Sequence, residues 1–284
     1  MNIKNKNVLV TGGSGFLGTA LVKRLLEDGN RVRVLSRDEG QLIELEQKFP
    51  HANLEIYTGD IADEFTVAQA VQRMDGVFHL AAFKHVGLAE KFTTECTQSN
   101  IIGSLNILAA SLQYHLDFVV GISTDKAAQV AGVYGATKLI MEKMFKQYEN
   151  VNERCQYRIV RYGNVLYSTG SVLCKWKKLL SEDRQCTITE PDATRFYWNV
   201  EQAIDLIYDC CDEATDSTPF CPTMKAMRIG DLFDAMSQKY GTKPIAPKII
   251  GLGLGENLHE KVLDEGPYSN EVTLYTIEEI MEMV

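Results

Sequence analysis

The chain has 284 residues, of which 45% are hydrophobic and 24% are charged, as is usual for a soluble globular protein. Its 38 acidic and 29 basic residues give a net charge of -9, which argues against a nucleic-acid-binding surface. No apolar run reaches the roughly 18 residues of a membrane span, and the N-terminus lacks a signal-peptide core. Seven scattered cysteines without C-x-x-C spacing predict neither disulfides nor a metal site. We therefore expect a cytoplasmic protein without a membrane or nucleic-acid partner.

A glycine-rich turn joins the first two predicted elements. Residues 8–10 form a short apolar strand, and leucines at every fourth position over residues 17–25 predict a helix. The glycines between them permit a tight turn and close approach of the backbone to a pyrophosphate, and the helix N-terminus offers unpaired N–H groups to the anion. The residues expected to contact a dinucleotide here are Gly12, Ser14, Gly15, Phe16, Leu17 and Gly18.

The end of the second predicted strand, residues 31–35, selects the cofactor. A carboxylate there would bind the ribose 2′-hydroxyl of NAD, but this chain has Ser36 and Arg37. A hydroxyl and a guanidinium suit a 2′-phosphate, so the sequence favours NADP. The alternative is a solvated arginine on a loop, since Asp38 and Glu39 follow directly.

Later strands bring further groups to the same edge of the sheet. A helix at about 39–48 precedes strands at 54–57 and 77–80. Ala81 and Ala82 follow the second of these, and small side chains at the carboxyl end of a strand let a cofactor lie across it.

The most informative stretch follows a buried apolar strand predicted at residues 118–122. Thr124, Asp125 and Lys126 leave its carboxyl end, the edge at which open α/β sheets bind ligands. Tyr134 and Lys138 then lie four residues apart in a predicted helix and share one face. An ammonium near a phenol favours the phenolate, so we expect Lys138 to lower the pKa of Tyr134 and make it an acid–base group near neutral pH. A Y-x-x-x-K pair alone is a weak signal, but its position behind a dinucleotide motif favours a catalytic role.

The motifs S-T-D-K-A (123–127) and Y-G-A-T-K (134–138) resemble the nucleotide-sugar branch of the extended short-chain dehydrogenase/reductase family, and most closely its inverting UDP-N-acetylglucosamine 4,6-dehydratases. The resemblance runs from residue 7 to about 265. It implies a Rossmann-type α/β fold, a doubly wound parallel sheet with a small C-terminal α/β substrate lobe. Residues 1–164 and about 197–221 would form the NADP-binding domain, and residues 165–196 and 222–284 the lobe. A homo-oligomer, dimeric or larger, is also implied.

Other motifs carry individual contacts over from the family. Asp60 and Ile61 match a pair that borders the adenine, and Lys84, in F-K-H-V, would lie beside the nicotinamide or the sugar. Asn100 matches a helix asparagine that supports the active-site backbone. The resemblance also implies contacts with the substrate, some of them in the R-Y-G-N-V and G-S-V motifs that follow a predicted strand at 157–160. These contacts are Lys84, Asn164, Ser171, Val172, Thr189, Arg195 and Glu256.

A C-terminal loop departs from the family's pattern R-P-G-E-K-L-H-E. It follows a predicted helix ending near Tyr240 and a strand at 248–250, and it has Gly253 in place of the arginine and Asn257 in place of the lysine. That arginine normally grips the substrate diphosphate, so its replacement puts phosphate affinity in question. Glu256 remains as a contact for the uridine ribose, and Arg195 has the chemistry to pair with a diphosphate.

The reaction implied by the resemblance is a redox-neutral dehydration of a UDP-sugar. NADP⁺ accepts a hydride from C4 while Tyr134, with Thr124 and Lys138, removes the proton of the 4-hydroxyl. Lys126 then removes the C5 proton, provided that its surroundings lower its pKa, and Asp125 protonates the leaving C6 hydroxyl. The hydride returns to C6, and reprotonation from the opposite face inverts C5.

Two other functions remain open from the sequence. A C4-epimerase or 4-reductase of the same branch needs only Thr124, Tyr134 and Lys138, and the additional Asp125–Lys126 pair argues against it. A non-catalytic NADP-binding sensor is supported by Gly253 and Asn257. The intact Thr124, Tyr134 and Lys138 set argues against a sensor, which has no need of a tuned phenol.

Overall fold

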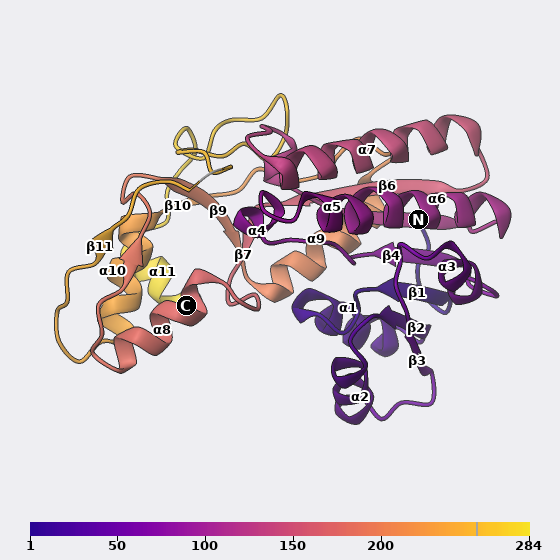
Figure 1. Ribbon diagram of the computed structural model, residues 1–284, viewed down its shortest axis with the longest axis horizontal. Coiled ribbons are helices and arrows are strands. Elements are labelled where there is room, and N and C mark those ends of the chain that lie inside the picture. The colour runs from indigo at the N-terminus through magenta and orange to yellow at the C-terminus, as the bar shows by residue number, and fades with distance from the viewer. Residues whose placement is uncertain (254) are drawn as a thin grey trace.

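The computed structural model describes residues 1–253 and 255–284, and a six-stranded parallel sheet forms its larger part (Figure 1). The strand order is β3-β2-β1-β4-β5-β6, so the chain leaves β1 in opposite directions and opens a crevice between β1 and β4. This doubly wound sheet confirms the expected fold class. The strands are β1 (Asn7–Thr11), β2 (Arg31–Ser36), β3 (Leu54–Thr58), β4 (Gly76–His79), β5 (Phe118–Thr124) and β6 (Gln156–Tyr162).

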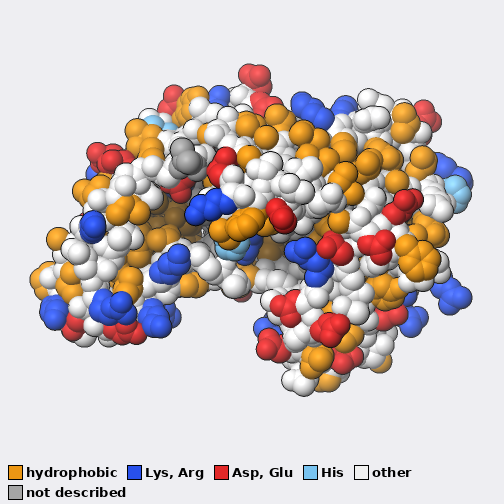
Figure 2. Space-filling model, viewed as in Figure 1, with side chains coloured by type: hydrophobic (Ala, Val, Ile, Leu, Met, Phe, Trp, Pro, Cys, Tyr) orange, Lys and Arg blue, Asp and Glu red, His pale blue; other side chains and the backbone are white. Residues whose placement is uncertain are grey.

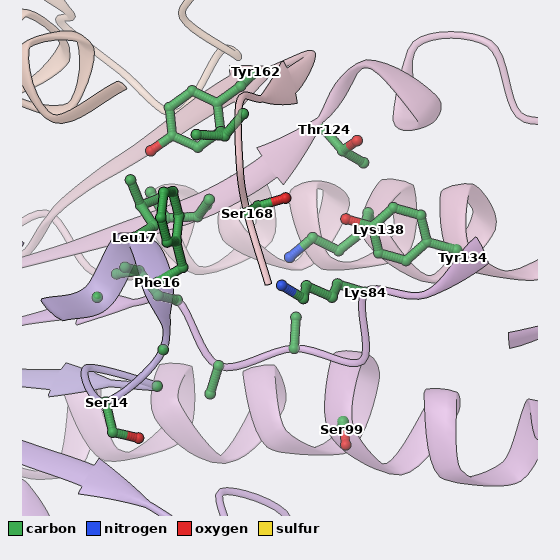
Figure 3. Close-up of a pocket in the computed structure, with 18 of the residues that line it drawn as sticks. Ser14, Phe16, Leu17, Lys84, Ser99, Thr124, Tyr134, Lys138, Tyr162 and Ser168 are labelled. Atoms are coloured by element: carbon green, nitrogen blue, oxygen red, sulfur yellow. The ribbon is translucent and has the colours of Figure 1, made fainter. Parts of the chain in front are cut away.

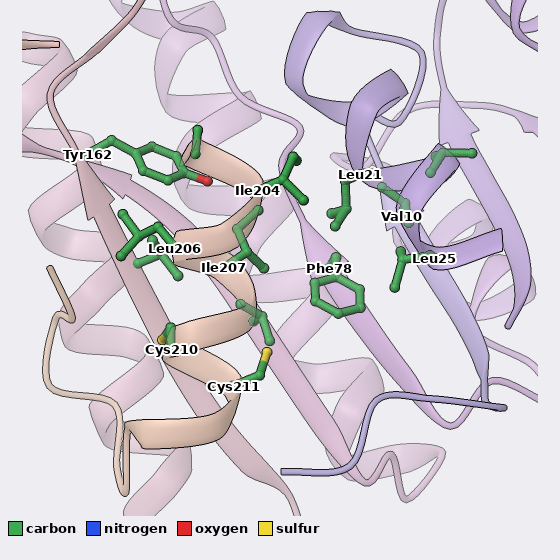
Figure 4. Close-up of a cluster of buried hydrophobic side chains, with 14 of the residues drawn as sticks. Val10, Leu21, Leu25, Phe78, Tyr162, Ile204, Leu206, Ile207, Cys210 and Cys211 are labelled. Carbon is green, nitrogen blue, oxygen red and sulfur yellow. The ribbon is translucent and has the colours of Figure 1, made fainter. Parts of the chain in front are cut away.

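Helices cover both faces of the sheet because successive strand residues point to opposite sides. In β1, Val8 and Val10 pack in a cluster with α1, α2 and α9, whereas Leu9 packs in a second cluster with α3, α6 and α7. Figure 4 shows the first cluster, in which Ile204 and Ile207 of α9 face Leu21 of α1. The covering helices are α1 (Phe16–Glu27), α2 (Glu39–Lys48), α3 (Glu64–Ala70), α6 (Gly103–Gln113), α7 (Val133–Val151) and α9 (Val200–Glu213).

A smaller lobe lies beside the sheet and has its own apolar core (Figure 1). Trp176 of α8 and Phe233 of α10 pack edge to face in this core, with ring centroids 5.5 Å apart. The lobe's helices are α8 (Val172–Ser181), α10 (Ile229–Tyr240) and α11 (Ile277–Met283). Its small sheets are formed by β7 (Asn164–Val165), β8 (Thr187–Ile188), β9 (Thr194–Trp198), β10 (Ala226–Arg228) and β11 (Lys248–Ile249), in the orders β10-β9-β7 and β11-β8. The assignment of the two parts to cofactor and substrate stays a prediction.

Short helical elements follow strands β4 and β5 in the chain. They are α4 (Val86–Ala89), α5 (Thr93–Thr97), a π-helical turn at Gln98–Ile102 and a 3₁₀ turn at Asp125–Ala127. The predicted strands and helices of the sheet domain are confirmed, but β5 and β6 are longer than expected and take in Thr124 and Tyr162. The strands β7 to β10 were missed because two to five residues show no usable hydrophobic period. Within the described residues, no helix has both the length and the apolar character needed to cross a bilayer.

Candidate active site

A cavity of about 700 Å³ opens at the carboxyl ends of the parallel strands, between the sheet and the small lobe. Figure 2 shows the surface hollowed between these two parts, and Figure 3 shows side chains of both entering the cavity. Most of the residues predicted from the sequence line it: Gly12, Ser14, Gly15, Phe16, Leu17, Gly18, Ser36, Arg37, Asp60, Ile61, Ala81, Ala82, Lys84, Thr124, Lys126, Tyr134, Lys138, Asn164, Ser171 and Val172. The structure therefore brings the dinucleotide motif and the Tyr134 helix to one site.

The glycine-rich turn forms one end of this cavity. Gly12 has a positive φ of 69°, and a Cβ atom there would lie 2.8 Å from the backbone nitrogen of Ala81. A Cβ atom on Gly18 would lie 2.6 Å from the Cα atom of Gly13, so helix α1 can pack this closely only without that side chain. Because α1 begins at Phe16 directly after the turn, its free N–H groups face the cavity. This backbone cradle and helix N-terminus fit the pyrophosphate of a dinucleotide.

The end of β2 forms the neighbouring wall. The hydroxyl of Ser14 donates to that of Ser36 at 2.8 Å, and the guanidinium of Arg37, with 64% of its side chain exposed, lies 3.4 Å from the carboxylate of Asp60. The carboxylate of Asp38 accepts the backbone N–H of Gln41 at 3.0 Å and thereby caps α2. Arg37 is consequently the charged group at this wall that is not committed to the backbone.

Asn100 links the backbone of the loop after β4 to the backbone of helix α7. Its side-chain oxygen accepts the N–H of Phe83 at 2.7 Å, and its amide donates to the Phe83 carbonyl at 3.0 Å and to Thr137 Oγ1 at 2.9 Å. Thr137 Oγ1 in turn donates to the carbonyl of Tyr134 at 2.8 Å. Asn100 lies in the π-helical turn, whose extra residue re-aims side chains at functional sites. The expectation that Asn100 supports the active-site backbone is confirmed.

A buried histidine, missed in the sequence, supports the same region. His79 Nδ1 lies 2.9 Å from Thr11 Oγ1, and its Nε2 lies 3.0 Å from Ser104 Oγ. Burial, reinforced by the charge of Lys138, lowers the pKa of His79 to about 3, so the ring stays neutral. Thr11 Oγ1 also accepts the backbone N–H of Ala81 at 3.2 Å, which fixes the end of β4 beside the glycine-rich turn. The only signal for it was a polar residue at the end of an apolar strand.

Tyr134 and Lys138 enter the cavity from α7, on the same face as expected, and Lys84 enters from the loop after β4 (Figure 3). Burial raises the pKa of Tyr134 to about 12, and the charge of Lys126 and a hydrogen bond with Thr124 offset this only in part. The expected lowering of that pKa is therefore wrong for the chain by itself. Burial also lowers the pKa of Lys138 to about 8, against the opposing charge of Glu142.

The Asp125–Lys126 pair differs from its expected arrangement. Asp125 is fully buried and does not line the cavity, and its Oδ1 accepts both Thr124 Oγ1 and Lys126 Nζ at 2.9 Å. Lys126 does line the cavity, with its Nζ atom 3.6 Å from Glu260 Oε1. Burial alone would lower the pKa of Lys126, but the carboxylates of Asp125 and Glu260 outweigh burial and raise it. A lowered pKa was the condition for Lys126 to act as the C5 base, and the chain by itself does not meet it, because Asp125 and Glu260 both oppose burial.

Three predicted substrate contacts lie outside the cavity lining. The carbonyl of Thr189 accepts the N–H of Gly251, and Glu256 accepts the N–H of Gly253 at 3.0 Å. Arg195 is buried, donates to the carbonyls of Thr194 and Leu258, and lies 3.6 Å from Glu260, so its guanidinium is already paired within the protein. Conversely, the sequence missed several polar and aromatic lining residues in α2, the π-helical turn, the end of β6 and the lobe, namely Gln41, Ser99, Tyr162, Ser168 and Tyr197. No metal-binding group of three acidic, histidine or cysteine residues occurs in the described ranges.

Comparison with known proteins gives concordant results. The profile of a family described as "Polysaccharide biosynthesis protein" matches residues 8–282. An inverting UDP-N-acetylglucosamine 4,6-dehydratase of Campylobacter jejuni is 35% identical over 260 residues, which cover 90% of this chain and 76% of the relative. A UDP-glucose 4-epimerase of Rickettsia canadensis is 30% identical over 267 residues, covering 91% and 78%. The crystal structure of Pen from Bacillus thuringiensis superposes with a TM-score of 0.93 at 28% identity and covers 99% of this chain and 97% of its own.

Proposed function

Because the chain belongs to the polysaccharide biosynthesis protein family, whose relatives here include nucleotide-sugar dehydratases and epimerases, we propose that it is an inverting UDP-N-acetylglucosamine 4,6-dehydratase. It would convert UDP-N-acetylglucosamine to the C5-inverted UDP-2-acetamido-2,6-dideoxy-hexos-4-ulose. The greater identity to the dehydratase, 35% against 30% for the epimerase, supports this choice.

The observation that carries the proposal is the Asp125–Lys126 pair beside Tyr134. Oxidation at C4 needs an acid–base group for the 4-hydroxyl, and Tyr134 with Thr124 supplies it. Removal of the C6 hydroxyl needs a second group that moves the C5 proton, and Lys126 is a titratable group on the same cavity wall. An epimerase has no use for that second group.

The buried position of Asp125 changes its proposed part in the reaction. Asp125 does not line the cavity, so it acts on the sugar only through Lys126, along their 2.9 Å hydrogen bond. Transfer of the ammonium proton of Lys126 to Asp125 would supply the neutral amine, at a cost in free energy because both neighbouring carboxylates favour the ammonium form. The amine can then take the C5 proton, and the same pair returns a proton to the leaving hydroxyl.

We propose NADP as the cofactor. When bound, its nicotinamide would accept the hydride from C4 and donate it to C6. Gly12, Gly18 and the N-terminus of α1 would hold its pyrophosphate. Arg37 supports the 2′-phosphate, because the carboxylate of Asp38 is engaged as a helix cap and is not free to bind a ribose.

The test is a proton NMR spectrum of UDP-N-acetylglucosamine incubated with the enzyme and NADP⁺ in D₂O. We expect the C6 hydroxymethyl signals to give way to a methyl group, with deuterium at the inverted C5. Tyr134→Phe should abolish oxidation at C4, whereas Lys126→Ala should still bind NADP⁺ but form no methyl group. A Lys126→Ala variant that dehydrates at the normal rate would remove Lys126 as the C5 base.

The rival functions give different spectra. A C4 epimer with an intact C6 hydroxyl would assign the chain to the epimerases, which the Rickettsia relative and the Thr124, Tyr134 and Lys138 set support. A 4-keto product that keeps the original C5 configuration from the start would assign it to retaining dehydratases. An unchanged substrate, with NADP bound, would favour a non-catalytic sensor.

A further inference from the structure

A second carboxylate, that of Glu260, lies beside Lys126 and does not line the cavity. Glu260 is fully buried, and its Oε1 atom lies 3.6 Å from Lys126 Nζ and 3.6 Å from Arg195 Nε. Within residues 1–253 and 255–284, neither oxygen of this carboxylate accepts a hydrogen bond. An ionised carboxylate in such surroundings is costly unless cations compensate it, and Lys126 and Arg195 are the two cations within ion-pair distance.

The backbone of Glu260 is fixed from two sides. Its N–H donates to Ser269 Oγ at 2.9 Å, and its carbonyl accepts the N–H of Ser269 at 2.8 Å. Ser269 Oγ also donates to the carbonyl of Thr194 in β9 at 3.0 Å, and Thr194 Oγ1 lies 2.8 Å from His259 Nδ1. These bonds fix the backbone position from which the Glu260 side chain reaches the Lys126 ammonium.

Charges from every neighbouring element act on Lys126. The two carboxylates favour its ammonium form, Arg195 and burial oppose it, and two buried phenols complete the surroundings. In order along the chain these groups are Asp125 in the 3₁₀ turn, Tyr134 in α7, Arg195 and Tyr197 in β9, and Glu260. Asp125 alone offers one opposing charge, and Glu260 supplies the second.

We infer that Glu260 is a positioning residue that holds the Lys126 ammonium at the cavity wall and, with Asp125, sets the pH at which Lys126 loses its proton. The catalytic significance of this rests on the proposed function, in which Lys126 must become an amine to take the C5 proton. The raised pKa of Glu260 itself, caused by burial and countered by Lys126 and Arg195, fits a carboxylate whose ionisation depends on these cations. Sequence reasoning gave Glu260 no role.

The first test measures the protonation of Lys126 without turnover. The full-length protein is acetylated with trace acetic anhydride over a pH series, and modification of Lys126 is quantified by peptide mass spectrometry. In Glu260→Gln, the half-labelling pH of Lys126 should fall by about one unit or more, because an opposite charge about 4 Å away is removed. Glu260→Asp keeps the charge at a greater distance and should give an intermediate value.

The matched control is Glu265→Gln, which removes an exposed carboxylate on the same segment and should leave the half-labelling pH unchanged. If Glu260→Gln does not fold, as judged by circular dichroism, Glu260→Asp carries the test with a smaller fall. An unchanged half-labelling pH in the folded Gln variant, or in Asp when Gln is unfolded, would overturn the inference.

The second test uses the pH profile of C5–deuterium exchange into the sugar. Glu260→Gln should move the limb due to Lys126 to lower pH by the same amount as the labelling shift. A merely structural role would lower the rate equally at every pH and leave the profile in place, and that result would overturn the inference. A shifted labelling curve in a protein that never dehydrates the sugar would sustain the role of Glu260 and reject the proposed function.

Discussion

The two ends of the cavity are built in different ways. At the glycine-rich end, the shape comes from one continuous strand–turn–helix segment in which side chains are absent, as Gly12 and Gly18 show. At the charged end, Lys126, Arg195 and Glu260 come from three separate parts of the chain and meet only in the folded protein. The first end is a matter of local backbone geometry, and the second is a balance of long-range charges.

This difference explains which properties follow from local sequence. A turn that needs glycine can be recognised from neighbouring residues, because the steric conflict involves atoms a few residues away. The charge on a buried lysine depends on every group around it, and at Lys126 the two carboxylates of Asp125 and Glu260 together outweigh burial and raise the pKa. Substitutions at the two ends should accordingly fail differently, by lost stability at the charged end and by lost binding at the glycine-rich end.

The largest expected effect is on stability, at the ion pair beneath the charged end. Arg161 and Glu142 are buried and bonded twice, at 2.7 and 2.6 Å, and Arg161 also holds the carbonyl of Val262. Arg161→Met leaves the Glu142 carboxylate buried without its cation, so the free energy of unfolding should fall by about 3–5 kcal/mol. Urea unfolding followed by circular dichroism measures this loss.

The control for that prediction is an exposed pair. Arg184→Met removes the partner of Glu182, whose side chain is 41% exposed, and should change the free energy of unfolding by less than about 1 kcal/mol. Combining Arg161→Met with Glu142→Leu should recover much of the loss, since both charges of this pair are then absent. Equal losses for Arg161→Met and Arg184→Met would show that burial does not make the Arg161–Glu142 pair the stronger of the two.

The next effect is on cofactor binding, at the glycine-rich end. A Cβ atom on Gly18 would lie 2.6 Å from the Cα atom and 2.8 Å from the carbonyl carbon of Gly13, so α1 must move away from the turn. We expect Gly18→Ala to weaken NADP binding by about 100-fold, or about 2.7 kcal/mol, as measured by isothermal titration calorimetry. Gly87→Ala is the control, because a Cβ atom there meets nothing within 4 Å. Unimpaired binding by Gly18→Ala would show that the turn adapts.

Sequence reasoning identified the sheet, the dinucleotide turn and the Tyr134–Lys138 pair because each depends on local periodicity. It failed on Asp125, which is fully buried and does not line the cavity that Thr124 and Lys126 line. The reason is that β5 is longer than expected. The predicted strand ended at residue 122, so the directions of the side chains after it could not be derived from strand alternation.

The remaining failures concern contacts between distant segments. Arg195 has the chemistry to bind a diphosphate, but its guanidinium is committed to the carbonyl of Leu258 and to Glu260. Neither partner can be inferred from the residues next to Arg195. The same holds for Glu260 and Lys126, whose proximity depends on how the C-terminal segment packs against β9 through Ser269.

A smaller effect is expected on the pH dependence of NADP binding, through Lys138. Lys138 carries a proton below its pKa of about 8 and loses it above, because burial lowers that pKa from its usual range. If the ammonium helps to hold the anionic cofactor, NADP affinity should be constant below pH 7 and fall about tenfold by pH 9. Lys138→Arg keeps its charge and should show no such fall, whereas Lys143→Arg, an exposed control on the same helix, should behave as the unchanged protein. An affinity that is flat from pH 7 to 9 would exclude Lys138 from cofactor binding.

The smallest effect is expected at Arg37, where a charge acts at the exposed rim of the glycine-rich end. Its side chain is 64% exposed and lies 3.4 Å from Asp60, so solvent and that carboxylate both weaken its pull on a 2′-phosphate. We expect NADP to bind about fivefold more tightly than NAD, equivalent to about 1 kcal/mol for an exposed ion pair, with the margin shrinking at high salt. Arg37→Asp should reverse the preference, because a carboxylate repels the phosphate and accepts the ribose hydroxyl. Arg31→Asp, a charge reversal at the opposite end of β2, should leave it intact. Equal affinities of the unchanged protein for the two cofactors, measured by calorimetry, would reject Arg37 as the selecting residue.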